Sequence, residues 1–161
     1  MCGAARTNEY LVLAVFFAGS ALNGQLAPVI ELATTLRAAQ FAAHTWHTRV
    51  AGRTFMQDHE FLGELYEAYE GAYDRVVERL VGLGKTPDLQ QVTLDAATLH
   101  SKILAIKKDW PEVFLEVEKA IRHDADAALL QKQSNGTQNF LQGLCDESEQ
   151  RTYKLGQRAK S

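Results

Sequence analysis

The sequence predicts an all-α protein, a four-helix bundle with a long crossover between its second and third helices. Much of the chain is Ala, Leu, Glu, Gln, Lys and Arg, which favour helices, and there are only 3 Pro. Apolar residues recur at steps of three and four, and no stretch shows the alternation typical of a strand. With 161 residues, the chain is expected to form one domain with a substantial core.

The first helix is expected after Asn23-Gly24, with Pro28 in its first turn, where a missing N–H is harmless. It should end near Gly52. One face is predicted to be buried, made of Val29, Leu32, Leu36, Ala39, Ala43, Trp46 and Val50.

The second helix is expected to open with a capping box, Thr54-x-x-Gln57, and to end at Gly82 and Gly84. Its predicted core stripe contains a histidine among aromatic and aliphatic residues: Phe55, His59, Leu62, Tyr66, Tyr69, Tyr73, Val76 and Leu80. The three tyrosines fit core packing better than a radical or electron-transfer path.

The stretch from Lys85 to Asp109 is predicted to be a crossover with a short amphipathic helix around residues 89–106. Asp109 as a cap and Pro111 in the first turn predict a third helix that runs to about Gln133. A fourth helix, capped by Thr137, should continue to about Gln157. This order is that of a ferritin-like bundle. Periodicity alone does not distinguish it from cytokine-like or regulatory bundles.

Residues 1–22 form an apolar N-terminal extension to the predicted bundle domain of residues 23–161. The run YLVLAVFFAGSAL (10–22) is shorter than the roughly 20 residues of a membrane span, and no convincing cleavage site follows it. A packing segment or subunit contact is the favoured interpretation, and no membrane is expected as a partner. A secretory signal or membrane-associated segment is the alternative.

Charge and cysteine content point to a cytoplasmic protein without a disulfide framework. The formal net charge of −3 gives no general attraction to nucleic acid. Cys2 and Cys145 belong to no metal-binding or disulfide pattern, and reduced thiols are the simplest interpretation.

Four residues are candidates for metal chemistry: His47 at the edge of the first apolar face, His59 on the second, and Asp74 and Glu78 four residues apart on one helix face. Imidazole and carboxylate ligands suit iron, manganese or zinc. Spacing alone also fits plainer roles, since a lone histidine on an apolar face is more often a hydrogen-bonded core residue. Asp74 and Glu78 flank arginines, as on a solvated ion-pair face. His44, His100 and His123 are expected to be structural or surface residues.

Three segments resemble the signature of the Dps mini-ferritins. HTRVAGRTF (47–55), His59 and DRVVER (74–79) are similar to the family's His-Trp-Asn-x-x-Gly-x-x-Phe, a following His, and Asp-x-x-Ala-Glu-Arg. NGTQNFL (135–141) resembles the Gly-Asp-x-Gly-Thr turn that opens the last helix. The resemblance covers about residues 26–155 with the same helix order.

The resemblance implies that His47, His59, Asp74 and Glu78 are ferroxidase ligands, the histidines from one subunit and the carboxylates from its two-fold partner. It implies a di-iron or mono-iron site in a hollow dodecamer. This cage would oxidise Fe(II) with peroxide or oxygen, store the ferric mineral and so protect DNA from oxidative damage.

This chain departs from the family pattern at three places. Gly63 stands where the family usually has a carboxylate four residues after the second His, and the candidate replacements are Glu67 or the nearby Glu60 and Glu64. Thr48-Arg49 replaces Trp-Asn, and Tyr153 replaces a common Trp. A catalytically weak cage with a structural or DNA-associating role is therefore the alternative, and a membrane- or partner-attached bundle is a third.

DNA binding through a lysine-rich tail has little support, because residues 1–8 contain a single basic residue, Arg6. The C-terminal end carries a modest basic cluster of Arg151, Lys154, Arg158 and Lys160. Cations are favourable near a helix C-terminus in any case, so a solvated helix end is the favoured interpretation.

Overall fold

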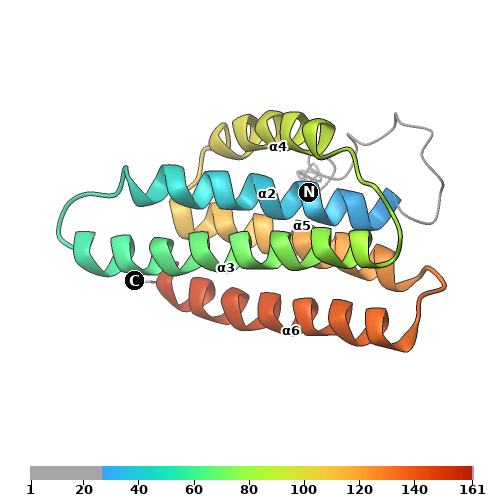
Figure 1. Ribbon diagram of the computed structural model, residues 1–161. Helices are drawn as coiled ribbons and strands as arrows, with labels where there is room; N and C mark the ends of the chain where they lie inside the picture. The colour runs from blue at the N-terminus through green and yellow to red at the C-terminus, as the bar shows by residue number, and fades with distance from the viewer. Residues whose placement is uncertain (1–26, 161) are drawn as a thin grey trace, which may run out of the picture.

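The computed structural model describes residues 27–160, and all the regular structure in this part of the chain is helical. The helices are α2 (Ala27–His47), α3 (Phe55–Gly82), α4 (Leu89–Leu104), α5 (Trp110–Leu129) and α6 (Asn135–Arg158). Four of them, α2, α3, α5 and α6, lie alongside one another, and α4 packs on the outside of α2 (Figure 1). The predicted all-α four-helix bundle with a short helix in its crossover is confirmed.

The apolar run of residues 10–22 lies outside the described residues. None of the helices that the structure describes is long and apolar enough to cross a membrane.

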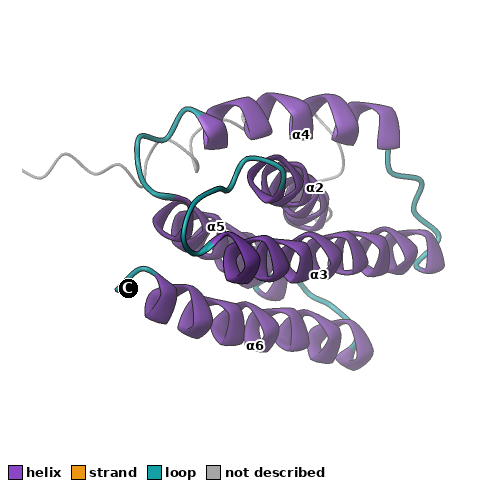
Figure 2. Cartoon of the chain, turned by 90° about the vertical axis from the view of Figure 1, so that its left-hand side faces the viewer, coloured by secondary structure: helices purple, strands orange, loops and turns teal. Residues whose placement is uncertain are grey.

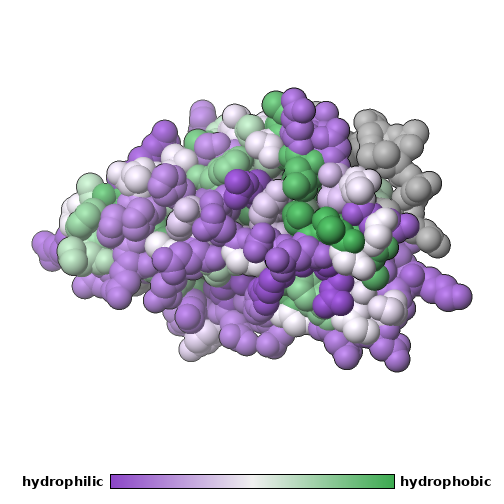
Figure 3. All heavy atoms as spheres, in the orientation of Figure 1, coloured by the Kyte–Doolittle hydropathy of each residue, from purple (hydrophilic) through white to green (hydrophobic). Residues whose placement is uncertain are grey.

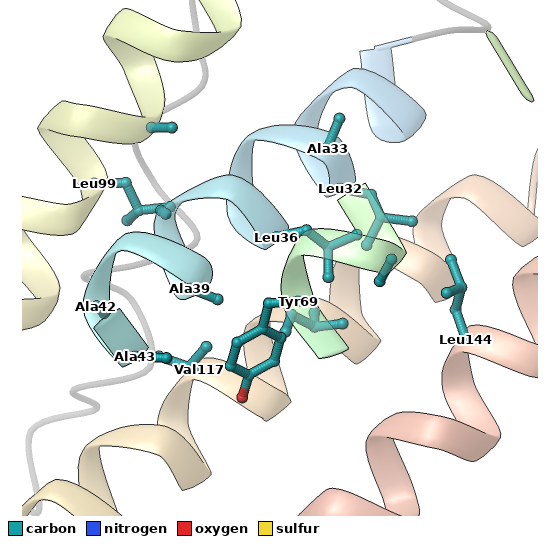
Figure 4. Packing of buried hydrophobic residues seen from close by; sticks show 14 of the residues in the cluster. Leu32, Ala33, Leu36, Ala39, Ala42, Ala43, Tyr69, Leu99, Val117 and Leu144 are labelled. Carbon is teal, nitrogen blue, oxygen red and sulfur yellow. The ribbon is translucent and has the colours of Figure 1, made fainter. Parts of the chain in front are cut away.

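Helix α2 is buried on almost every side, because α3, α4 and α5 all pack against it (Figure 2). The predicted stripe is confirmed, with Trp46 and Val50 at its half-buried end. Alanines outside that stripe are buried as well, and Figure 4 shows Leu99 of α4 on one side of α2 and Tyr69 of α3 on the other. Small side chains let neighbouring helices approach α2 closely, and a helix that is apolar all round belongs inside a protein.

The core stripe of α3 is confirmed for most of its length, including the tyrosines. Tyr69 is fully buried, and Tyr66 and Tyr73 pack against the core from its edge. Phe55 is the exception, because it lies at the first turn of the helix and is 38% exposed. Its ring stacks on that of His59, with 5.1 Å between the ring centroids.

One face of the bundle is largely hydrophilic, with apolar side chains gathered on the right in Figure 3, where α3 ends and α4 begins. The exposed large apolar residues of these two helix ends and their connection are Val81, Leu83 and Leu89. Singly exposed apolar side chains are normal on a protein surface, and contiguous ones are typical of surfaces that other molecules cover.

Two helix ends differ from prediction around the connection between α2 and α3. α2 ends at His47, five residues before Gly52, and its last turn tightens as the amides of Arg49 and Val50 both donate to the carbonyl of Trp46. The predicted capping box does not form. The Thr54 hydroxyl donates to the carboxylate of Asp58 at 2.8 Å, which leaves no side-chain cap on α3.

Side-chain caps form at the starts of α4 and α6. Asp88 caps α4 by accepting from the amide of Gln91, at 3.0 Å. Asp109 precedes α5 in an extended conformation but forms no side-chain cap bond, while Pro111 lies in the first turn as predicted. The cap of α6 is Ser134 rather than Thr137: the Ser134 hydroxyl accepts from the amide of Thr137 at 3.3 Å. α5 ends at Leu129, earlier than predicted.

A buried carboxylate ties three helices of the bundle together. Glu118 of α5 has no exposed surface, and the Tyr69 hydroxyl of α3 donates to it at 2.6 Å. From α6, the Ser148 hydroxyl and the Arg151 guanidinium also donate to it, each at 2.6 Å. Burial, and then the charge of Glu118, raise the pKa of Tyr69 well above its usual value. Tyr69 therefore stays a hydrogen-bond donor near neutral pH.

Replacing Glu118 with alanine should lower the free energy of unfolding by about 3–5 kcal/mol, because Arg151 would lose its partner inside the bundle. Chemical denaturation at fixed protein concentration measures this loss. Arg75→Ala is a matched control: Arg75 and Glu147 also join α3 to α6, at 2.8 Å, but their side chains are 48% and 37% exposed. That variant should lose less than about 1 kcal/mol. Similar losses in the two variants would contradict the prediction.

Candidate functional site

The connection between α2 and α3 brings His47 and His59 together. Their imidazole rings stack with 3.7 Å between centroids and 25° between planes. Each ring also bonds to the backbone of the other residue: Nδ1 of His47 lies 2.8 Å from the carbonyl oxygen of His59, and Nδ1 of His59 lies 2.9 Å from that of His47. Of the predicted site residues, these two form a pair within one protomer.

The reciprocal bonds determine which nitrogen of each ring is available to a ligand. A carbonyl oxygen only accepts hydrogen bonds, so each Nδ1 must carry the proton that it donates. A neutral imidazole then has its lone pair on Nε2, the nitrogen through which histidine can bind a metal ion. Backbone carbonyls that bond the other ring nitrogen are the usual second shell of a metal-binding histidine. The pair is thus arranged to present two Nε2 ligands.

Gly63 borders this pair, one helical turn after His59. A Cβ atom placed on Gly63 would lie 3.4 Å from Cε1 and 3.5 Å from Nδ1 of His47, an ordinary contact distance. The His47 ring therefore lies against the backbone of α3 at the position where the Dps pattern has a carboxylate. Glycine supplies no ligand there, although the space admits a Cβ atom.

Asp74 and Glu78 lie exposed on α3, far from the histidines of their own chain. Fifteen residues separate His59 from Asp74, or about 22 Å along a helix. Among the described residues neither carboxylate has a hydrogen bond or an ion pair. The prediction that Asp74 and Glu78 form ion pairs with the neighbouring arginines is thus wrong. Arg75 instead bonds Glu147 of α6, and Arg79 lies over the ring of Phe140, 4.9 Å from its centroid.

Glu67 is also exposed on α3, two turns beyond His59 and about 12 Å along the helix from it. Glu64, which is nearer to the pair, lies 4.0 Å from the ammonium of Lys154. Within residues 27–160 no group of three or more His, Cys, Asp or Glu side chains is placed to hold a metal ion. The described chain therefore carries the imidazole pair and the carboxylate pair at separate places.

The other histidines have the structural or surface positions expected of them. His44 is exposed beside the Tyr66 ring, and Nε2 of His100 lies 3.0 Å from the Thr45 hydroxyl. Burial lowers the pKa of His100. His123 is exposed and lies 3.2 Å from the carboxylate of Asp124.

The basic cluster at the C-terminal end is largely occupied inside the protomer. Arg151 bonds Glu118, Lys154 faces Glu64, and Arg158 bonds the carboxylate of Asp58 at 2.7 Å and 2.9 Å. The hydrogen bonds from Arg158 hold the pKa of Asp58 below its usual value. No local sequence pattern predicts the bond between Arg158 and Asp58, because the two residues are 100 positions apart.

A family model provides the comparison for this helical arrangement. The model of the ferritin-like domain matches residues 20–159, which is most of the chain. No curated protein matches the chain. Together with the bundle and its crossover helix, this match shows that the chain belongs to the ferritin-like domain family, a membership that suggests iron storage or iron oxidation as its function.

Proposed function

We propose that this protein is a Dps-like mini-ferritin. It would bind Fe²⁺, oxidise it with peroxide or oxygen, and hold the ferric product inside a dodecameric cage, which protects DNA from oxidative damage. The observation that carries this proposal is the stacked His47/His59 pair, whose reciprocal backbone bonds leave Nε2 of each ring for a metal ion. Membership of the ferritin-like family supports it.

The site would lie between two protomers related by a two-fold axis. In such a contact residue i of one copy meets residue j of the other, and the reverse contact forms as well. The imidazole pair of each copy would then meet Asp74 and Glu78 of its partner, giving two equivalent sites per dimer. The separation of the two pairs along α3, and the lack of partners for both carboxylates within the described part of the protomer, support this arrangement.

The proposed ligands suit the oxidation of iron. Carboxylate oxygens stabilise Fe³⁺ by their charge, and imidazole nitrogens bind Fe²⁺ well. Two ferrous ions would each give one electron to a peroxide molecule, which takes up two protons and leaves as two waters. The oxidised iron would then pass to the mineral in the cage.

Gly63 favours the second candidate, a cage with weak ferroxidase activity and a structural or DNA-associating role. Without a carboxylate at position 63, each protomer offers two neutral imidazoles and, among its described residues, no carboxylate grouped with them. A site of this kind binds Fe³⁺ less strongly than one with three carboxylates. DNA association stays a prediction, and the internal contacts of Arg151 and Arg158 leave it with less basic surface.

The purified oligomer should oxidise Fe²⁺ faster than protein-free solution, because the site would gather iron beside the oxidant. The measurement is ultraviolet absorbance after mixing with peroxide and then with oxygen, followed by size exclusion to detect iron eluting with the particle. A correctly assembled particle that neither accelerates oxidation nor retains iron would move the second candidate ahead.

His59→Ala and Asp74→Ala should each lower the oxidation rate at least about tenfold, as expected for loss of a metal ligand. Both oligomers should stay assembled, and His123→Ala, at an exposed histidine away from the pair, is the control. Co-expressing the two variants tests the shared site. With random pairing, about half of the dimers are mixed, and each mixed dimer has one intact site of its two. About a quarter of the wild-type activity should therefore return. No recovery in mixed oligomers would contradict a site between protomers.

Gly63→Asp should raise the oxidation rate and tighten iron binding, because it places a carboxylate beside the His47 ring in a space that admits a Cβ. Gly71→Asp is the matched control. It adds the same charge to the same helix, at an exposed glycine where an added Cβ would meet no atom within 4 Å. Equal rates in the two variants would show that position 63 does not limit the site.

A further inference from the structure

The C-terminal end of α6 is bonded to the first turn of α3 beside the imidazole pair. The Arg158 guanidinium donates to both oxygens of Asp58, from Nε at 2.7 Å and from Nη2 at 2.9 Å. The Thr54 hydroxyl donates to the same carboxylate at 2.8 Å, and the Asp58 side chain is only 7% exposed. These two parallel bonds fix the orientation of the carboxylate relative to the guanidinium as well as the distance between them.

Aromatic residues of α3 and α5 lie around this ion pair. The guanidinium lies 5.9 Å from the centroid of the Trp110 ring, and Trp110, at the start of α5, is itself buried. Phe61 of α3 also packs against that ring, with 5.8 Å between centroids. The ion pair therefore sits where the ends of three helices meet, and a partly dry site of this kind makes a charge-assisted bond stronger than one on the surface.

Besides Arg158, the Thr54 hydroxyl and the Trp110 side chain hydrogen-bond the Asp58 carboxylate in the first turn of α3. The residues of the preceding connection are exposed except for the half-buried Val50, and Thr54 forms no side-chain cap because its hydroxyl bonds Asp58. His59 follows Asp58 directly. Its carbonyl accepts the bond from His47, and its ring donates the return bond, so both bonds depend on the position of this turn.

We propose that Arg158 is a positioning residue for the iron site: through Asp58 it holds the first turn of α3 so that His59 keeps its stacked, doubly bonded geometry with His47. This inference rests on the proposed function, because it assigns a role to a residue outside the ligand set. It gives the C-terminal end of α6 a part in metal binding without direct contact with metal.

Cobalt binding by the full-length oligomer tests this inference, since Co²⁺ reports its ligand geometry in its visible absorption. Arg158→Gln should weaken Co²⁺ binding about tenfold and change the shape of the spectrum, as the loss of a group that orients a metal ligand does. Asp58→Asn, a neutral isostere, should give the same spectral change and guards against a folding defect specific to Arg158→Gln. Arg158→Lys should recover part of the affinity, because lysine restores the charge but not the two-pronged bond.

Lys154→Gln is the matched control. It removes the same charge from α6 one turn earlier, at a side chain that is 59% exposed and faces Glu64. Its affinity and spectrum should equal those of wild type. Tight binding by wild type that Arg158→Gln leaves unchanged, or an equal loss in Lys154→Gln, overturns the positioning role alone. No Co²⁺ binding by assembled wild type overturns the metal site of the proposed function, and the inference with it.

Discussion

The buried carboxylate of Glu118 is the interaction that joins three helices of the bundle at one point. A charge without exposed surface must be paired and hydrogen-bonded, or the protein loses several kcal/mol of stability. Glu118 meets this requirement with one donor from α3 and two from α6. These bonds form at one register of the three helices, because sliding α6 by a turn would separate Arg151 from its partner. Apolar side chains tolerate such a shift better than a buried ion pair does.

Helices α3 and α6 are joined by polar contacts along much of their length. Arg75 with Glu147, Lys154 with Glu64, and Arg158 with Asp58 connect α3 to α6 on either side of the Glu118 network. The exposed pairs contribute little energy individually. The pair at Asp58 differs, because it is largely shielded and lies next to His59. Polar contacts between α3 and α6 thus extend from the Glu118 network to the first turn of α3, next to His59.

The imidazole pair and the carboxylate pair lie at separate places in the bundle. His59 and Asp74 of one chain cannot meet, because both lie on the straight helix α3 and about 22 Å of backbone separates them. Any site that uses both pairs requires a second protomer, and a two-fold contact would form the site twice. The glycine at position 63 places no negative charge beside the histidines. This is the position where the chain departs most clearly from the Dps pattern.

Local patterns in the sequence determined the helices and most of the core. Steps of three and four identified the buried faces of α2 and α3, and Asp109 with Pro111 identified the start of α5, because these signals act within a turn or two of the chain. The Dps resemblance singled out His47 and His59, and the structure brings them together. Whether Asp74 and Glu78 join them stays a prediction, because that contact would lie between chains.

Tertiary structure alone decided the contacts between distant residues. Thr54 was predicted to cap α3, but the carboxylate of Asp58, held by Arg158, draws its hydroxyl away. Glu118 was not among the residues that the sequence pattern singled out, and the meeting of three helices buries it. Such interactions depend on which surfaces face each other after packing, and they join residues as far apart in the chain as Thr54 and Arg158.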